Sequence, residues 1–371
     1  MSIFHEFGLR KIINGSGKMT ALGATAVNDL IAENLKRASQ DYVDIEEMMQ
    51  YAGKVIAEHT GAEDGCPTCG AAAGIAISVA TAITGNSLSL IERLPDSIGL
   101  KNEIIIQKGH MVHFGGNIGQ MIRLGGGKVV EVGSSNKVEK DHISEAVNEN
   151  TAALLYIKSH HAVQKGMQPI EEMVEIAKSN NIPLIIDAAA EEDLKKYIGM
   201  GADIVIYSGG KALGGPTSGF ICGKKELMTA ARKQYKGIGR AMKVGKEAVA
   251  GLITAIENYH LQGKPAKEQL QTMKELCSML SDVEGVECSI KQDEAGREIY
   301  RAQIAVSEKK AGVSAYQLKN LLEAGNPAIY LRDHYINIGI LSVDPRPLLP
   351  GQEEIIGTEI KRILEEANVN V

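Results

Sequence analysis

The stretch PLIIDAAAEEDLKKYIGMGADIVIYSGGK, which runs from Pro183 to Lys211, decides the fold. Two short apolar runs in it, Pro183–Asp187 and Asp203–Tyr207, have the length and the β-branched content of buried strands. Between them, the spacing of apolar residues in Glu191–Ile198 predicts a helix. A strand, a helix and a second strand in this order predict a parallel pair whose ligand site lies at the carboxyl ends of the strands.

The same alternation continues outward from this stretch. Four further apolar runs predict strands, at Glu103–Gln107, Lys128–Val132, Ala153–Ile157 and Gly219–Cys222. The periodicity predicts helices around Ala26–Lys36 and over Ile45–Thr60, Ile75–Thr84 and Ile170–Ser179. We therefore expect an α/β protein with a mainly parallel sheet. The last two strands are joined by only a short loop, so an antiparallel pair is the alternative there.

Three parts are expected along the chain. They are an N-terminal arm over residues 1–50, a large domain over residues 51–258 and a small α+β domain over residues 259–371. The second boundary falls at YHLQGKPAK (Tyr259–Lys267), where a Gly and a Pro stand among polar residues after a long helix. The small domain is predicted to contain a strand at Arg301–Val306, a helix at Ala315–Glu323, and two short strands around Ile329–Arg332 and Ile336–Ile340.

Composition argues against several classes of function. The formal net charge of −6 provides no global field for nucleic acid, so no nucleic-acid partner is expected. The opening MSIFHEFGLRKII lacks a secretory-signal pattern and no apolar run reaches membrane-spanning length, which predicts a cytoplasmic protein with no membrane partner. The five cysteines do not suggest a disulfide framework, and Cys66-Pro-Thr-Cys69 lacks a second ligand pair. We expect a turn there, and no metal site.

Asp187 and Lys211 together predict a site for pyridoxal 5′-phosphate (PLP). That cofactor needs a lysine to hold its aldehyde as a Schiff base, an anion beside the pyridine nitrogen, and donors for its phosphate. Asp187 ends one predicted strand, and Lys211 follows the next one, 211 − 187 = 24 residues later. Ser208 offers a hydroxyl to the phosphate, while glycines 209 and 210 let the backbone approach it. Taken singly, SGGK is typical of a surface loop and a strand-end Asp of a helix cap.

Two other segments extend this prediction. The small-residue turn CGAAAG (Cys69–Gly74) leads into a helix, so Cys69, Gly70 and Ala71 are predicted to form a phosphate cup. In KGHMVH, His110 is the candidate to stack on the cofactor ring, and His113 is the second choice. A hydrogen-bonded structural histidine is the alternative for either residue. The chain has neither the G-x-x-x-x-G-K-[ST] pattern of nucleotide-binding loops nor a G-x-G-x-x-G in its first strand–helix unit.

The stretch from about Asn102 to Tyr259 resembles the selenocysteine synthase-like branch of fold-type I PLP-dependent enzymes. The resemblance lies in KGHMVHFGG, VEVGSSN, GADIVIYSGGKALGGPTSG and GRAMKVGKE. More closely, SGKMTALG, YIKSHHAVQKGM, DAAAEEDL and GIGRAMKVGKE are similar to the ammonia-lyases of D-glucosaminate 6-phosphate, and this similarity runs nearly the full length. The implied fold is a fold-type I large domain with a small C-terminal domain.

The resemblance also implies an activity. Lys211 would remove the C2 proton of the substrate, the C3 hydroxyl would leave, and hydrolysis would release ammonia and 2-dehydro-3-deoxy-6-phosphogluconate. A substrate with a carboxylate and a phosphate needs cations in the site. The candidates for substrate binding are His160, His161, Lys165, Arg240, Lys243 and Arg332. For each lysine alone, a solvated surface charge is the simpler reading. Glu191 and Glu192 fit first-turn helix acids better than catalytic acids.

Other functions stay open at this point. Selenium transfer to L-seryl-tRNA(Sec) is the alternative activity within the same branch, although the chain shows no basic extension for tRNA. A non-enzymatic scaffold is the second alternative. Enzymes of this fold class usually build the site across a dimer interface, so a homodimer or a higher homo-oligomer is expected by analogy.

Overall fold

The computed structural model describes residues 3–159, 161–261, 266–293 and 298–369. These residues fall into two compact units. The large unit comprises residues 26–262, and the small unit comprises residues 1–25 together with residues 263–371. The segment expected as one arm, residues 1–50, is therefore divided between the two units.

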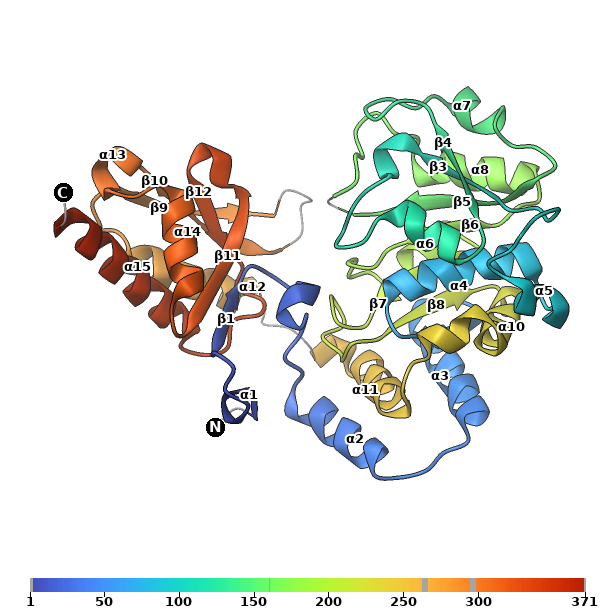
Figure 1. The fold of residues 1–371 in the computed structure, drawn as a ribbon, viewed down its shortest axis with the longest axis horizontal. Helices are drawn as coiled ribbons and strands as arrows, with labels where there is room; N and C mark the ends of the chain where they lie inside the picture. Colours follow the sequence, from blue (N-terminus) through green and yellow to red (C-terminus); the bar gives the residue numbers. More distant parts are fainter. Residues whose placement is uncertain (1–2, 160, 262–265, 294–297, 370–371) are drawn as a thin grey trace. The chain divides into compact units, whose positions relative to one another are not determined.

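The large unit is built on a seven-stranded sheet in the order β2-β8-β7-β6-β5-β3-β4 (Figure 1). The strands are β2 (Asp64–Thr68), β3 (Glu103–Gln107), β4 (Lys128–Val132), β5 (Thr151–Ile157), β6 (Leu184–Asp187), β7 (Ile204–Ser208) and β8 (Gly219–Gly223). The run from β4 to β7 is parallel, and β8 is antiparallel to both β7 and β2. The predicted α/β fold with a mainly parallel sheet is confirmed, and its last pair takes the antiparallel alternative.

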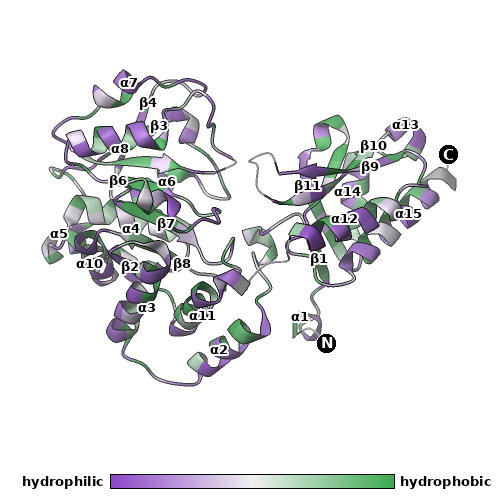
Figure 2. Cartoon of the chain, turned by 180° about the vertical axis from the view of Figure 1, so that it is seen from behind, coloured by the Kyte–Doolittle hydropathy of each residue, from purple (hydrophilic) through white to green (hydrophobic). Residues whose placement is uncertain are grey.

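Helices cover both faces of this sheet, which explains why its strands are almost continuously apolar. One face packs on α4 (Ala71–Thr84), α6 (Ile118–Leu124) and α10 (Lys225–Lys233), and the other on α8 (Ile170–Ser179) and α11 (Lys246–Glu257). The alternation of side chains sends Ile185 to the first face and Ile186 to the second. Figure 2 shows the result, with hydrophobic strands between helices that carry hydrophilic residues.

The other helical segments of the large unit are shorter or peripheral. They are α2 (Asp29–Ser39), α3 (Ile45–Thr60), α5 (Leu88–Arg93), α7 (Lys140–Ser144), α9 (Lys196–Gly199) and the 3-10 turns η2 (Lys108–His110), η3 (Gln234–Lys236), η4 (Ile238–Met242) and η5 (Tyr259–Leu261). Helix α3 has the predicted bounds because the Asp44 side chain accepts two first-turn N–H groups and Gly61 ends it at φ 72°.

Two local predictions for the large unit are wrong. The helix expected at Glu191–Ile198 is only α9, because the Asp193 carboxylate accepts the N–H groups of Lys195 and Lys196 and helical structure begins there. The turn expected at Cys66–Cys69 is instead the end of β2, and Cys69 lies just beyond it. Pro67 misled the prediction, although β2 is an edge strand, where a residue without an N–H is tolerated.

The small unit contains a five-stranded sheet in the order β1-β11-β12-β10-β9. Its strands are β1 (Ile12–Gly15), β9 (Val286–Gln292), β10 (Tyr300–Val306), β11 (Ala328–Tyr335) and β12 (Ile340–Val343). Only β1 pairs in parallel, with β11. The helical segments are α1 (Ile3–Glu6), η1 (Thr20–Leu22), α12 (Ala266–Met279), α13 (Glu308–Ala311), α14 (Ala315–Ala324), η6 (Ile336–Ile338) and α15 (Gln352–Val369).

One apolar core holds the small unit together and anchors β1 through Ile13. Ile13 is fully buried in this core with Met273, Leu318 and Ile360, which come from three different helices. The strand expected at Ile336–Ile340 is mostly the turn η6, and its pairing begins only at Ile340. Within the described residues, none of the helices has both the length and the apolar character that a bilayer crossing requires.

Candidate active site

The two predicted cofactor residues lie at neighbouring strand ends of the large unit. Strands β6 and β7 pair in parallel, with Asp187 in register with Ile206. Two residues later β7 ends at Ser208, and the chain turns through two glycines to Lys211. The turn fits closely, because Gly209 N donates to Ser218 O at 2.8 Å and a Cβ on Gly209 would overlap the Ser218 hydroxyl. Only glycine fits there, so the backbone rather than a side chain occupies this edge of the sheet.

Asp187 is a buried acid with few compensating contacts. Its exposed fraction is 6%, and its Oδ1 accepts one backbone N–H, from Ala189 at 3.1 Å. Burial raises the pKa of Asp187 to about 6, against the opposing effects of the Lys211 charge and the Ala189 N–H. A protonated ring nitrogen beside this carboxylate would lower its pKa and stabilise its charge. The carboxylate therefore fits the partner that a PLP pyridine nitrogen requires.

The other end of the site suits a phosphate group. Thr68 of β2 and Ser208 of β7 both pair with Gly219 of β8, so the end of β2 and the start of α4 lie at the same sheet edge as Ser208. Helix α4 has 14 residues and no side-chain cap at Gly70, where an added Cβ would meet open space. Its first-turn N–H groups and its dipole can therefore meet an anion. The Ser208 side chain, which is half-buried, makes no recorded hydrogen bond in the described part of the chain.

Cys69 and Ala71 flank this helix start and are half-exposed. Burial raises the pKa of the Cys69 thiol, so the thiol stays neutral beside a phosphate. Cys69, Gly70 and Ala71, the residues of the predicted cup, thus lie at the start of α4, and Ser208 lies at the same edge of the sheet. The donor set fits a phosphate monoester. Their contact with a cofactor stays a prediction.

His110 does not have the position of a stacking residue. Its side chain has no exposed surface, its Nδ1 accepts the Ile157 N–H at 3.3 Å, and its ring meets Tyr156 edge-on at 4.5 Å. Burial lowers the pKa of His110 to about 4, and the charge of Lys158 acts in the same direction. A neutral, enclosed imidazole with no open face corresponds to the structural alternative. His113 is exposed in the loop that follows.

Sequence reasoning missed three tyrosines that order the loop after Asp187. Tyr197 donates its hydroxyl to Glu191 Oε2 at 2.6 Å, Tyr207 donates to the Asp193 carbonyl at 3.1 Å, and Tyr259 donates to the Glu192 carbonyl at 2.9 Å. Glu191 and Glu192 therefore precede α9 and are not first-turn helix acids. The tyrosines stand 4 to 66 residues after the loop, a spacing without periodicity, so no local pattern could have identified them.

The predicted substrate-binding cations of the large unit stand in two places. His161 and Lys165 are exposed in the loop after β5, and His160 lies outside the described residues. Lys165 lines a shallow pocket with Asn136, Lys137 and Gln168, beyond the carboxyl ends of β4 and β5. Arg240 and Lys243 are exposed in and just after η4.

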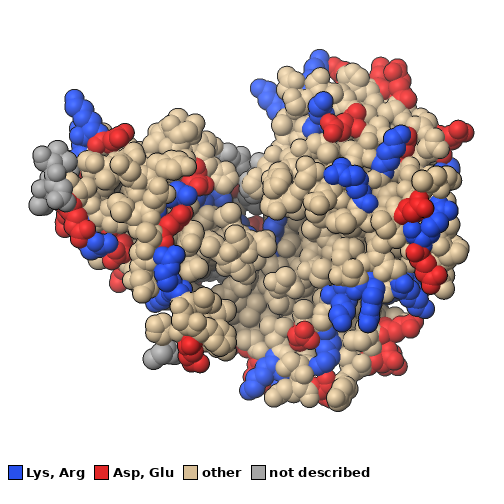
Figure 3. Space-filling view, in the orientation of Figure 1, with Lys and Arg blue, Asp and Glu red and all other residues tan. Residues whose placement is uncertain are grey.

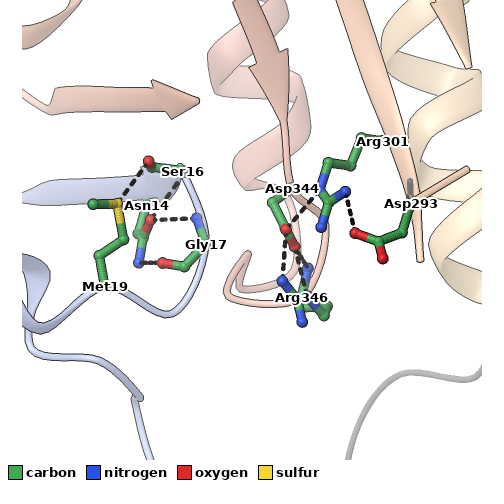
Figure 4. A network of polar contacts seen from close by, with 8 residues as sticks. All are labelled: Asn14, Ser16, Gly17, Met19, Asp293, Arg301, Asp344 and Arg346. Atoms are coloured by element: carbon green, nitrogen blue, oxygen red, sulfur yellow. Dashed lines mark hydrogen bonds and ion pairs between the residues drawn. The ribbon is translucent and has the colours of Figure 1, made fainter. Parts of the chain in front are cut away.

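Arg332, the remaining predicted cation, lies on β11 of the small unit. The charges of the arginine–aspartate network that Figure 4 shows act on it. Asp344 accepts from Arg301 Nε at 3.0 Å and from two nitrogens of Arg346 at 2.9 Å. Burial lowers the pKa of Arg332, and the charges of Arg301 and Arg346 lower it further against the attraction of Asp344. Within the described residues, the half-buried Arg332 guanidinium has no recorded hydrogen bond or ion pair.

The loop after β1 closes one side of this cluster. Asn14 Oδ1 accepts the N–H groups of Ser16 and Gly17 at 3.0 and 3.2 Å, and its Nδ2 donates to Gly17 O at 2.8 Å. Gly17 has a φ of 118°, and a Cβ added to it would lie 3.7 Å from an Arg332 nitrogen. The loop therefore brings backbone, and no bulky side chain, next to the arginine.

Comparison with known proteins gives consistent results. The family model described as "SelA: L-seryl-tRNA selenium transferase" matches residues 12–324. A D-glucosaminate-6-phosphate ammonia lyase from Salmonella typhimurium is 44% identical over 366 residues, which cover 99% of both chains. A 5'-C-glycyluridine monooxygenase-decarboxylase from a Streptomyces species is 42% identical and covers 97% of this chain and 92% of its own.

Solved structures extend this result to the fold. The structure of a D-glucosaminate-6-phosphate ammonia-lyase matches with a TM-score of 0.94 and 43% identity over 99% of both chains. A serine palmitoyltransferase from Sphingomonas wittichii matches with a TM-score of 0.58 and 14% identity, over 97% of this chain and 88% of its own, which shows the fold alone. The predicted fold-type I architecture is thereby confirmed.

Proposed function

The chain belongs to the SelA family of L-seryl-tRNA selenium transferase-like, PLP-dependent enzymes, and on that premise we propose that it is a D-glucosaminate-6-phosphate ammonia-lyase. The reaction removes the C3 hydroxyl as water and the C2 amine as ammonia, with one water consumed at the end, to give 2-dehydro-3-deoxy-6-phosphogluconate. Similarity over 99% of both chains to an enzyme of that name supports the substrate.

The residues of the large unit have the chemistry that this reaction needs. PLP, when bound, supplies the electron sink that makes the C2 proton removable. The Asp187 carboxylate would hold a proton on the ring nitrogen, and the Lys211 amine would hold the cofactor aldehyde and accept the C2 proton of the substrate. Ser208 and the α4 start at Cys69, Gly70 and Ala71 hold the phosphate of the cofactor.

One observation carries the assignment of the cofactor site, namely the buried carboxylate of Asp187 at the strand end next to the one that leads to Lys211. A pKa of about 6 means that ionisation of Asp187 destabilises the folded chain when no ring nitrogen is present. This favours the binding of a cationic group beside the carboxylate. We propose that His161, Lys165, Arg240, Lys243 and Arg332 contribute to the binding of the two anionic groups of the substrate. His160, outside the described residues, stays a candidate from the sequence.

The decisive experiment follows both products. Purified enzyme loaded with PLP is incubated with D-glucosaminate 6-phosphate, and ammonia and 2-keto acid are measured over time. Equal amounts of the two products support the proposal, and no release of either one contradicts it. The loaded enzyme should also show a visible absorbance band that borohydride bleaches, and Lys211→Ala should lack this band.

A second activity has to be assayed as well, because the relative that carries it is nearly as similar to this chain as the ammonia lyase is. The 5'-C-glycyluridine monooxygenase-decarboxylase is only 2 percentage points less identical than the ammonia lyase. Oxygen uptake and carbon dioxide release with 5'-C-glycyluridine, without ammonia formation from D-glucosaminate 6-phosphate, would replace our proposal with this one. The near-complete coverage of both chains by the ammonia lyase favours the lyase.

Selenium transfer to L-seryl-tRNA(Sec) has weaker support. A selenium transferase from Alkaliphilus oremlandii is 28% identical, and the match covers 61% of its length. Acidic and basic side chains are interspersed over the face seen in Figure 3, which suits small ligands better than a polyanionic RNA. Salt-sensitive submicromolar binding of tRNA would revive this alternative.

We also propose a homodimer or larger homo-oligomer in the cytoplasm. Five large apolar side chains, all on or near α2 and α3, are between 45% and 98% exposed, namely Leu30, Tyr42, Val43, Ile45 and Tyr51. Contact with a second copy would remove these apolar side chains from water. Free cysteines, including the buried Cys66 and Cys222, are consistent with a reducing compartment. Light scattering after gel filtration gives the mass directly, and a monomer at micromolar concentration would contradict the oligomer.

A further inference from the structure

Lys158 is a second lysine at the carboxyl edge of the large sheet, and it follows the strand next to the one that ends in Asp187. It is the first residue after β5, and β5 pairs in parallel with β6 so that Ile157 is in register with Asp187. The Lys158 backbone N–H donates to the Asp187 carbonyl at 2.8 Å. Lys158 and Lys211 therefore follow the two strands on either side of β6, the strand that ends in Asp187.

A neutral network holds the Lys158 side chain. Its Nζ lies 3.5 Å from Gln164 Oε1, which also accepts the Tyr156 hydroxyl at 3.1 Å, while Gln164 Nε2 donates to the Ile157 carbonyl at 3.2 Å. Gln164 thus anchors the amine to the end of its own strand. An amide oxygen at 3.5 Å gives only a weak hydrogen bond and no opposite charge.

Three exposed lysines of the large unit show a contrasting situation. Lys128, Lys137 and Lys140 have side chains that are 49% to 69% exposed, and each forms an ion pair with a glutamate at 3.1 Å or less. Lys158 differs in both respects. It is half-buried, and no ion pair is recorded for it in the described part of the chain. Burying a charge without a counterion is costly, so such a lysine at a functional edge suits an anionic ligand.

A buried histidine near Lys158 does not compensate its charge. Burial keeps His110 neutral, and the charge of Lys158 acts in the same direction.

We propose that Lys158 is a substrate-binding residue, whose ammonium group takes an oxyanion of the substrate, and that Gln164 positions it. The inference rests on the proposed function and deepens it, because it names a cation for one of the two anionic groups of the substrate. A carboxylate and a phosphate offer the same chemistry to an ammonium group, so the test has to separate them.

The first test separates binding from chemistry. Lys158→Met keeps the length of the side chain and removes its charge, and Gln164→Leu removes the tether. Lys128→Met is the matched control, since Lys128 begins β4 at the opposite, amino edge of the same sheet and is 66% exposed. For D-glucosaminate 6-phosphate, Lys158→Met should raise KM about tenfold or more with kcat within about threefold. Gln164→Leu should raise KM less, and the control should match the wild type.

The second test identifies the anion without requiring turnover. Dissociation constants are measured by calorimetry for three ligands that lack the reacting amine: D-gluconate 6-phosphate, D-gluconate and D-glucitol 6-phosphate. Lys158→Met should weaken D-gluconate 6-phosphate about tenfold, together with the one single-anion ligand whose group contacts the ammonium. Weakened D-glucitol 6-phosphate assigns Lys158 to the phosphate, and weakened D-gluconate assigns it to the carboxylate.

Failure of the inference about Lys158 can be distinguished from failure of the proposed function. If the wild type does not turn over D-glucosaminate 6-phosphate, the proposed function fails, while the three dissociation constants still decide the role of Lys158. Unchanged constants in a Lys158→Met protein that retains its visible cofactor band would overturn the inference. A large loss of kcat with unchanged binding would also overturn it, because the lysine would then act in the chemical step.

Discussion

Two buried aspartates, one in each unit, show opposite electrostatics at nearly the same exposure. Asp187 is 6% exposed and Asp344 is fully buried. Burial raises the pKa of Asp187 to about 6. For Asp344, burial also favours the neutral form, but hydrogen bonds and charge from Arg346 and Arg301 outweigh it and lower the pKa to about 2.

The two pKa values differ because the aspartates have different hydrogen-bonding partners and not because their burial differs. Asp344 has two arginines within hydrogen-bonding distance, so the folded chain itself provides its counterions. Asp187 has one backbone N–H and the field of one lysine. A buried acid with complete compensation stabilises a fold, and one with incomplete compensation indicates a site that a ligand completes. Four predictions test this contrast.

The largest effect is expected from Asp187→Asn in the enzyme loaded with PLP. Without the carboxylate, the ring nitrogen loses the partner that keeps its proton, so kcat should fall roughly a thousandfold, or about 4 kcal/mol. Turnover and the absorbance of the bound cofactor are measured together. Asp141→Asn, at an exposed position on α7, serves as the control. A fall of less than tenfold would remove Asp187 from the mechanism.

Asp344→Asn should act on stability instead. The change removes one anion from a buried arginine cluster, in which Arg301 keeps only Asp293, and should lower the free energy of unfolding by about 3–4 kcal/mol at pH 7. Because the folded pKa is below the ordinary value of 3.8, this stabilisation is present above pH 4 and is lost as the pH falls towards 2. Denaturant titrations at pH 7 and at pH 3 measure it. Equal stability of variant and wild type at pH 7 would contradict the contrast.

Arg332→Ala tests the third arginine near Asp344, the one without a recorded partner among the described residues. If it takes an anion of the substrate equally in the ground and transition states, KM should rise roughly tenfold to a hundredfold with little change in kcat. Arg362→Ala is the control, because Arg362 is paired with Glu359 and Glu366 on the exposed side of α15. Unchanged kinetics would exclude Arg332 from the site.

The smallest expected effect is a gain in stability. In the protein without cofactor, Asp187→Asn should raise the free energy of unfolding by about 1–2 kcal/mol at pH 8. A folded pKa raised from 3.8 to about 6 means that the wild type loses stability as the pH rises through this window. The difference should therefore shrink as the pH falls towards 4 and vanish below the unfolded pKa of 3.8, where the acid is protonated in both states. Thermal unfolding at pH 4 and pH 8 checks this sign, and a loss at pH 8 would show that the carboxylate is already compensated.

The sequence predicted the core strands well because both faces of the sheet are covered. Strands β3 and β4 have their predicted bounds, and β5, β6, β7 and β8 differ by one or two residues. Apolar, β-branched runs of that length are typical of strands that are buried on both faces. Strand β9 was missed because its half-exposed residues alternate weakly, and β2 because Pro67 suggested a turn.

By itself, the sequence determined most strands of the large sheet, the fold class, and the chemical pair of Asp187 and Lys211, since these depend on local pattern and spacing. Only the tertiary structure decided that His110 is enclosed, that three distant tyrosines order the loop after Asp187, and that Lys158 is half-buried at the end of the neighbouring strand. Each of these depends on partners brought in by other segments of the chain, and a side chain's burial and charge balance are set by those partners and not by its sequence neighbours.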